Sequence, residues 1–575
     1  MAADGTLAIG RPGSDDVRKR RTRSATETVV YGFLFFAFAE VAIHLLTLAA
    51  GHQSAVTLAV SEPVATSFSR PDIVDRNGRL LATDLEAPSI YADPGVVLDR
   101  DELVEKLATV LPDIDQKELL RALSDRSRRF VWVRRGVSPK IAQRVHDLGL
   151  PGLSFRYELK RAYPAGLLAG HVLGTVNVDN RGLTGIEKYI DESIGTDPVH
   201  AASLSTRMPV RLSLDIGVQH ALEDELDDAE QKYRAAGSAG IVLNVKTGEV
   251  LASASTPRIN PAWPSQAHDD KYLDKMTAGT YELGSVFKTL TIAMALDEGL
   301  AKPDTVTDVR KPLEVGRFTV TDFHPANRPL SVTEIFTHSS NIGAGMLALQ
   351  AGPDKFEAFL RKFGMLSPLK TEEGPVAAPQ LPPKWGKAST ITISYGHGLA
   401  VAPLQFAAAT ASVLNDGKPP LQFAAATASV LNDGKPVHPT FLKRYGGDQA
   451  AEKSLVTRTT SRDMARLMRL NVTAPDGTGK EADVPGYRVG GKTGTADMPG
   501  RGGYSSKSVI SSFLGAFPMD DPQYVTFVIL FDPKGTADTK GQHTAGYTAA
   551  PVTGRLISRI AGQLGVAPTD VAASQ

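Results

Sequence analysis

The chain has 575 residues, 42% of them hydrophobic and 22% charged, which is typical of a globular protein with about two to four domains. This composition excludes a mostly disordered, collagen-like or polytopic membrane chain. Lys and Arg number 63, as do Asp and Glu, so the basic excess expected of a nucleic-acid-binding protein is missing. There is no cysteine, which excludes disulfides, a thiol nucleophile and a thiolate metal site.

A long apolar stretch lies near the N-terminus. Residues 29–50 would span roughly 33 Å as a helix, enough to cross a bilayer core. Five basic residues between positions 18 and 23 precede this stretch, and such clusters stay on the cytoplasmic side. We therefore expect a cytoplasmic tail over 1–27, an uncleaved signal anchor over 28–50, and the rest of the chain in the periplasm. A cleaved signal peptide is the alternative.

Two polar residues interrupt this apolar stretch. Glu40 and His44 are four residues apart, so they share one face of a helix. A charge inside a bilayer is costly. Glu40 is therefore either neutral and bonded to His44, or part of a polar face that docks another transmembrane protein.

Residues 51–205 are predicted to form an α+β module that begins with a polar linker. Asn77-Gly78 between two apolar runs is a strong signal for a β-hairpin. Residues 161–174 and 182–187 are rich in glycine and read as turns. Composition alone suggests no chemistry here, and a connecting helix over 206–235 follows.

Residues 236–567 are predicted to form one large α/β domain of the α+β type. Two strands fall within 240–255, and three more are expected at the other end of the segment. Together they can make an antiparallel five-stranded sheet with flanking helices. The helix-rich region between them is predicted to be an inserted helical subdomain. The remaining expected elements are strands at 487–496, 509–517 and 524–531, a helix at 549–564, and a disordered tail at 568–575.

A tandem repeat lies within this domain. Residues 403–419 recur letter for letter at 420–436, and each copy begins with a proline suited to a helix start and ends in Asn-Asp-Gly. The repeat therefore adds one helix and one turn, either as a recent duplication or as a sequence error. Two copies do not imply a solenoid.

Three short motifs in this domain suggest chemistry. Ser285-Val286-Phe287-Lys288 opens an apolar helix, Ser339-Ser340-Asn341 precedes another helix, and Lys492-Thr493-Gly494 lies in a predicted strand. Each motif is weak alone. Their order and predicted secondary structure match the motif set of one class of serine acyl-transfer enzymes.

The residue types fit this chemistry. Ser285 and Lys288 are three apart on one helix, and a serine hydroxyl needs such an adjacent base. Repulsion from Lys492 would help to keep the Lys288 amine neutral. Ser339 is a candidate proton relay to a leaving amine, and Asn341 a candidate to hold Lys288 and a substrate amide. Lys492 supplies a cation for a substrate carboxylate.

Plainer interpretations exist for the same residues. Ser285 can be a helix N-cap, Ser339 and Asn341 can cap the next helix, and Lys492 can be an edge-strand charge. Residues 486–493 also match the phosphate-loop pattern, which requires a following helix, whereas 494–503 is rich in Gly and Pro. We predict no cofactor and no metal, and we expect three nearby histidines to be structural: His324, His338 and His397.

The chain resembles the class B penicillin-binding proteins, and most closely the septal peptidoglycan transpeptidases of Gram-negative bacteria. The resemblance runs from residue 29 to about residue 567 and is carried by the predicted anchor and nine short motifs. These motifs are RPDIVDRNG at 70–78, RAYPAG at 161–166, GLTGIE at 182–187, YELGSVFK at 281–288, DFHPANR at 322–328, HSSN at 338–341, SYGHG at 394–398, GGKTGTA at 490–496 and AAPVTGR at 549–555.

The resemblance implies a penicillin-binding transpeptidase fold, with 51–205 as the non-catalytic pedestal, or dimerisation-type, domain. It implies acylation of Ser285 by stem peptides ending in D-Ala-D-Ala, cross-linking to a neighbouring stem, and covalent inhibition by β-lactams. It places the oxyanion at the N–H groups of Ser285 and Thr495. Implied partners are peptidoglycan, a polytopic glycan polymerase and other division proteins, without nucleic acid. The candidate substrate-binding residues are Thr493, Gly494 and Thr495.

Three functions compete at this point. The first is the D,D-transpeptidase, with a septal or an elongation role. The second is a catalytically impaired penicillin-binding scaffold, because the repeat follows closely on 395–398, which lines the site in relatives. The third is a membrane-tethered β-lactamase, which would need a placed water for rapid deacylation. Leu283 and Val286 replace the Pro and Thr of many relatives, and neither change removes a functional group.

Overall fold

The computed structural model describes residues 35–36, 38–40, 42, 69–194, 208–316, 318–416, 439–444, 454–500 and 503–569. The predicted anchor over 28–50 lies largely outside these ranges, as does the second copy of the repeat at 420–436. Within the described ranges, no helix is both long enough and apolar enough to span a bilayer. The chain divides into two compact units, residues 1–67 and 68–575, and the strands and helices named below lie in the second.

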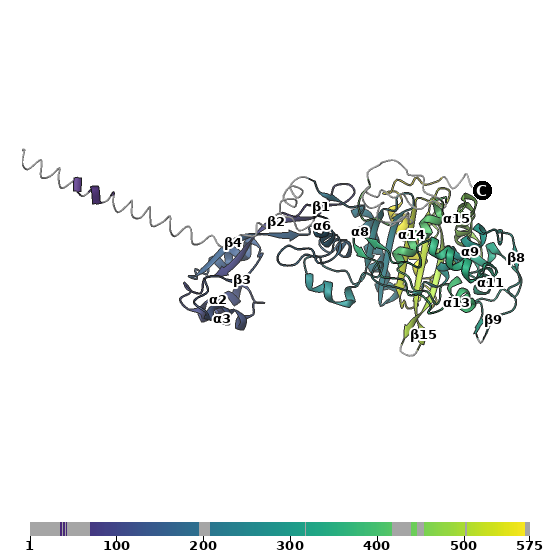
Figure 1. Ribbon diagram of the computed structural model, residues 1–575, viewed down its shortest axis with the longest axis horizontal. Helices are drawn as coiled ribbons and strands as arrows, with labels where there is room; N and C mark the ends of the chain where they lie inside the picture. Colours follow the sequence, from purple (N-terminus) through teal and green to yellow (C-terminus); the bar gives the residue numbers. More distant parts are fainter. Residues whose placement is uncertain are drawn as a thin grey trace, which may run out of the picture. The chain divides into compact units, whose positions relative to one another are not determined.

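The first part of the second unit contains a five-stranded sheet with helices (Figure 1). The predicted hairpin at Asn77-Gly78 is present, and Gly78 has a φ of +87° in the turn between β1 and β2. Beside the β2–β4 pair, α2, α3 and α4 bury an apolar core of their own. The strands are β1 (Ile73–Val74), β2 (Leu80–Ala92), β3 (Val131–Arg134), β4 (Leu153–Ala162) and β5 (Val210–Arg211). The helices are α2 (Arg100–Val110), α3 (Gln116–Ser124), α4 (Pro139–His146), α5 (Gly170–Leu173) and α6 (Gly185–Ile194).

Buried ion pairs join the glycine-rich segments that the sequence marked only as turns. Arg161 lies 2.7 Å from Glu187 and 3.1 Å from Asp84, and all three side chains are fully buried. Arg70 lies 2.9 Å from the same Glu187. Removing one partner from such a network leaves an uncompensated buried charge, so these residues fix how their segments pack.

The predicted five-stranded antiparallel sheet forms from both ends of the following segment. Its order is β14-β15-β16-β6-β7, with β6 (Gly237–Asn244), β7 (Val250–Ser255), β14 (Gly490–Gly500), β15 (Gly503–Phe517) and β16 (Tyr524–Phe531). All eight residues of the central strand β16 are buried. Its side chains alternate between two cores, one on each face of the sheet.

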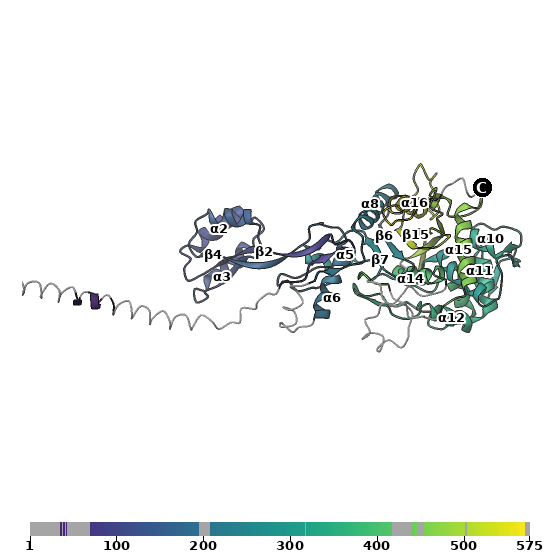
Figure 2. The ribbon, with the colours of Figure 1, turned by 90° about the horizontal axis from the view of Figure 1, so that it is seen from above.

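Helices cover both faces of this sheet (Figure 2). On one face lie α8 (Ile216–Tyr233) and α16 (Ala549–Ile560), which bring together the two ends of the segment. On the other face lie helices from the insertion between β7 and β14, among them α9 and α14. Every residue of α14, which lies within the first copy of the repeat, is buried. The inserted helices are α9 (Lys288–Asp297), α10 (Val332–Thr337), α11 (Asn341–Ala351), α12 (Pro353–Lys362), α13 (Lys387–Ser394), α14 (Pro403–Leu414) and α15 (Arg458–Thr473).

Short hairpins complete the insertion, and one of them leads into the candidate site. β9 (Leu313–Val315) pairs with β10 (Phe318–Val320), and the chain then continues to Asp322. The other short strands are β8 (Val306–Thr307), β11 (Leu330–Ser331), β12 (Lys370–Thr371) and β13 (Gly374–Pro375).

Candidate active site

Ser285 and Lys288 lie at the start of α9. The sequence predicted that Ser285 opens the α-helix, but it sits in a 3-10 turn, Gly284–Phe287, that precedes α9. Gly284 has a φ of +60°, and a Cβ there would lie 2.7 Å from the Thr495 carbonyl oxygen, so glycine is required. This close approach sets the Ser285 turn against β14. The Lys288 Nζ lies 2.9 Å from the Ser285 Oγ.

Ser339 and Asn341 reach the same lysine from the start of α11. Ser340, rather than either of them, caps this helix, because its hydroxyl accepts a hydrogen bond from the Gly343 N–H. Ser339 has a φ of +62°, a left-handed conformation that is uncommon for serine. Lys288 Nζ lies 2.6 Å from the Ser339 carbonyl oxygen, 3.1 Å from its Oγ and 2.7 Å from the Asn341 Oδ1.

Lys492 enters from the edge strand β14. Its Nζ lies 3.0 Å from the Ser339 Oγ, so this hydroxyl stands between the two amines. The Thr493 Oγ1 donates to the Thr478 Oγ1 at 2.7 Å. A Cβ on Gly494 would lie 2.7 Å from the Leu283 carbonyl oxygen, which again reflects how closely β14 packs against the serine turn. The Thr495 Oγ1 accepts from the Ala545 N–H at 3.3 Å.

Burial dominates the electrostatics of both lysines. The side chains of Lys288 and Lys492 are fully buried. Burial, followed by repulsion from Lys492, holds the pKa of Lys288 well below its usual range, and Asp322 acts in the opposite direction. Burial lowers the pKa of Lys492 to about 7. Both shifts favour the neutral form of the amine, and at Lys288 the repulsion from Lys492 adds to the effect of burial.

The contacts of the Lys288 Nζ are those expected of a neutral amine. A neutral amine has two N–H donors and one lone pair. The two donors match the Ser339 carbonyl and the Asn341 Oδ1, at 2.6 and 2.7 Å. The lone pair is then available to the hydroxyl proton of Ser285, whose Oγ lies 2.9 Å from the Lys288 Nζ. This is the arrangement of a general base.

The structure thus brings together all five residues predicted as catalytic: Ser285, Lys288, Ser339, Asn341 and Lys492. The phosphate-loop alternative is wrong, because the residues directly after Lys492 continue as strand β14 through Gly500, where a phosphate loop requires a helix. The proposal that Ser339 and Asn341 only cap α11 also fails, since Ser340 provides the cap.

Sequence reasoning assigned no role to three residues that support the site. The Asp322 carboxylate accepts from the Ser340 Oγ at 2.6 Å and from the Asn341 N–H. Asn471 on α15 donates to the Gly491 carbonyl at 2.9 Å and accepts from the Thr478 Oγ–H. Asp322 opens the motif DFHPANR, which contributed to the family resemblance without suggesting a role for the carboxylate. Nothing near Asn471 or Thr478 in the sequence links them to the motifs.

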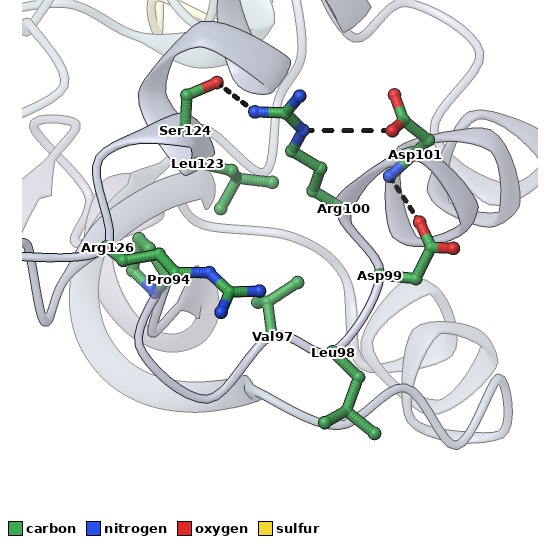
Figure 3. Close-up of a pocket in the computed structure, with 9 residues that line it drawn as sticks. All are labelled: Pro94, Val97, Leu98, Asp99, Arg100, Asp101, Leu123, Ser124 and Arg126. Carbon is green, nitrogen blue, oxygen red and sulfur yellow. Dashed lines mark hydrogen bonds and ion pairs between the residues drawn. The ribbon is translucent and has the colours of Figure 1, made fainter.

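A separate cavity of about 230 Å³ lies at the start of α2, far along the chain from these residues (Figure 3). Its polar groups are largely satisfied by one another: Arg100 donates to the Ser124 Oγ at 2.6 Å, and Asp99 caps α2. It contains none of the predicted site residues. We therefore place the chemistry at the buried lysines rather than in this cavity.

Comparison with known proteins places the two parts of the chain in described families. The penicillin binding protein transpeptidase domain matches residues 238–419 and 419–557, and the penicillin-binding protein dimerisation domain matches residues 66–197. The probable peptidoglycan D,D-transpeptidase FtsI of Caulobacter vibrioides is 37% identical over 506 residues, which cover 87% of this chain and 82% of that protein.

More distant relatives carry names of the same two kinds, D,D-transpeptidase and penicillin binding protein. The probable peptidoglycan D,D-transpeptidase PenA of Neisseria meningitidis is 29% identical over 524 residues, covering 87% of this chain and 85% of that protein. Among solved structures, penicillin binding protein 3 of Mycobacterium tuberculosis complexed with ampicillin superposes with a TM-score of 0.65 at 25% identity. That match covers 88% of this chain and 97% of the solved chain.

Proposed function

Because the chain belongs to the class B penicillin-binding proteins, we propose that it is a serine D,D-transpeptidase that cross-links peptidoglycan stem peptides ending in D-Ala-D-Ala. The observation that carries this proposal is the 2.9 Å contact between the Ser285 hydroxyl and a buried lysine whose pKa lies well below its usual range. Relatives named D,D-transpeptidases and a relative solved with ampicillin support the same substrate class.

Acylation begins at Ser285. Its Oγ attacks the carbonyl carbon of the penultimate D-Ala while the hydroxyl proton passes to neutral Lys288. The tetrahedral intermediate collapses when the amide C–N bond breaks, and the proton returns from Lys288 to the leaving D-Ala amine through the Ser339 hydroxyl. Ser339 suits this relay because its Oγ lies 3.1 Å from Lys288 and 3.0 Å from Lys492.

Deacylation reverses these steps with a different amine. An amine of a neighbouring stem attacks the ester carbonyl and gives its proton to Lys288. The ester C–O bond then breaks, and the departing Ser285 oxygen takes that proton from Lys288. A β-lactam enters by the same first step, but its ring opens without releasing an amine from the site, so the adduct persists.

Lys492 and β14 bind the substrate. Lys492 offers the cation for the terminal carboxylate, with the Thr493 hydroxyl beside it. β14 lies at the edge of the sheet and can pair with an extended peptide. The backbone N–H groups of Ser285 and Thr495 are the proposed oxyanion donors. The close approach at Gly284, where a Cβ would lie 2.7 Å from the Thr495 carbonyl oxygen, supports this, because it brings the two backbones together.

Membrane attachment and a septal role are part of the same proposal. The apolar stretch at 29–50 and the basic cluster before it support a single-pass inner-membrane protein with its catalytic domain in the periplasm. The resemblance to septal transpeptidases implies a role at the septum with a polytopic glycan polymerase as the membrane partner, and one relative, from Caulobacter vibrioides, is named FtsI. An elongation role is the alternative, and septal localisation of a fluorescent fusion separates the two.

Labelling by a fluorescent penicillin tests the chemistry. The full chain should form a covalent adduct that survives for minutes, and Ser285→Ala should abolish it. Ser558→Ala is the matched control, because Ser558 is an exposed residue of α16 whose hydroxyl bonds only within that helix. D-Ala release from a pentapeptide substrate should follow the same pattern.

Other outcomes would identify the competing functions. An adduct without D-Ala release would indicate the impaired scaffold. Rapid turnover of the penicillin would indicate a β-lactamase. Labelling that persists in Ser285→Ala would refute the proposed nucleophile.

A further inference from the structure

Asp322 is a buried carboxylate that does not contact Ser285 and yet anchors the residues around its base. It lies just after β10 and is 9% exposed. Its Oδ2 accepts from the Ser340 Oγ at 2.6 Å, and its Oδ1 accepts from the N–H groups of Asn341 and Ile342 at 2.5 and 3.0 Å. A carboxylate at a helix N-terminus is favourable, so these bonds hold the start of α11 in place.

The turn that Asp322 holds supplies most of the contacts made by Lys288. Residues 340–342 bond to Asp322, whereas Ser339 and Asn341 provide three of the four contacts of the Lys288 Nζ. Ser339 adopts its left-handed conformation at the first residue before this anchored segment. A shift of the turn would therefore move the carbonyl, the hydroxyl and the amide that orient the base.

Asp322 also contributes charge. Two lysine side chains are buried here, and the electrostatic effects of Lys492 and Asp322 on Lys288 oppose one another. Lys288 is in turn one of the charges that act on the buried His397, which follows α13, together with Glu282 and Asp497. Among the described residues, Asp322 is the carboxylate that raises the pKa of Lys288.

We propose that Asp322 is a positioning residue for acylation: its carboxylate fixes the Ser339–Asn341 turn and balances the charge of the two lysines, and so sets the pH range in which Ser285 reacts. This inference rests on the proposed function, because it concerns the base of the same reaction. It adds a group outside the three motifs to the machinery that tunes that base.

The test is the pH profile of the second-order rate constant for acylation by a fluorescent penicillin, measured on the full chain in detergent. Asp322→Asn keeps the size of the side chain and an oxygen for the two N–H groups, but it removes the charge. Loss of an attractive charge favours the neutral form of Lys288, so the acid limb of the profile should move to lower pH. Asp322→Glu keeps the charge and should leave the limb in place, even if the rate falls.

Asp322→Ala removes the anchor itself. Misplacement of a catalytic group by about 1 Å can cost roughly 10²-fold in rate, and we expect a loss of that order. Asp308→Asn is the control for net charge, because Asp308 is exposed and forms its ion pair with the equally exposed Arg310. It should change neither the limb nor the rate. Contributions from His397 are common to all four variants and cancel in the comparison.

Two results would overturn the inference. One is an acid limb in Asp322→Asn that coincides with that of the parent chain, whether the rate is unchanged or uniformly lower, since a purely structural residue would behave in this way. The other is an Asp322→Glu profile that moves as far as that of Asp322→Asn. Failure of the proposed function is distinguishable, because the parent chain would then form no Ser285 adduct at any pH.

Discussion

Replacing Lys492 by methionine should make the protein more stable while abolishing its acylation. The Lys492 side chain is fully buried, and its pKa falls from 10.5 to about 7 on folding. A lysine whose pKa is lowered in the folded state costs stability below that pKa, because the folded protein must hold a charge that the unfolded chain carries freely. The cost falls as the pH rises from about 7 towards 10.5. Methionine has a similar length and no charge, so Lys492→Met removes this cost.

The magnitude follows from the shift. At about 1.4 kcal/mol per pKa unit, the charge costs about 5 kcal/mol at pH 6 and about 2 kcal/mol at pH 9. Loss of the Lys492 hydrogen bonds, of which the one to the Ser339 Oγ at 3.0 Å is the shortest, reduces this gain by roughly 1 kcal/mol at either pH. Lys492→Met should therefore be more stable than the parent chain by about 4 kcal/mol at pH 6, and this advantage should shrink by about 3 kcal/mol at pH 9.

Urea denaturation of both proteins at the two pH values measures this difference, and fluorescent penicillin labelling measures the loss of function. Substitutions that remove a destabilising residue from a functional site commonly raise stability and lower activity. If Lys492→Met were less stable than the parent chain at pH 6, or if the difference between them did not change with pH, the reasoning about a buried ammonium would be refuted.

Two further predictions concern regions away from the lysines. Arg161→Met should lower the free energy of unfolding by about 3–5 kcal/mol, because it removes the arginine that pairs with the buried Asp84 and one of the two that pair with the buried Glu187. Arg156→Met on the exposed face of the same strand should have little effect in the same urea titration. Deleting residues 420–436 should leave both the denaturation midpoint and the rate of penicillin labelling at or above those of the parent chain. The reason is that the copies are identical, so the shortened chain retains every residue of the buried helix α14. Equal midpoints for the two arginine variants would contradict the first prediction, and loss of labelling in the shortened chain would contradict the second. Intact mass of the natural protein would show which form of the repeat it carries.

The sequence by itself determined the local parts of this protein. A spacing of three residues is enough to bring the Lys288 amine to the Ser285 hydroxyl, because helical geometry fixes that distance within one turn. The strand at 524–531 was predicted with its observed bounds, since a continuous apolar run between turns is what a strand buried on both faces requires. The turn at Asn77-Gly78 followed from backbone preferences alone.

Only the tertiary structure decided which of these parts meet. Ser339 is 51 positions from Lys288 and 153 from Lys492, and no short-range pattern fixes distances across such loops. The fold also revealed that Ser340 is the helix cap, that Asp322 anchors the turn, and that both amines are fully buried. Burial is what shifts the lysine pKa values, and it is a property of the packed sheet and helices rather than of any stretch of sequence.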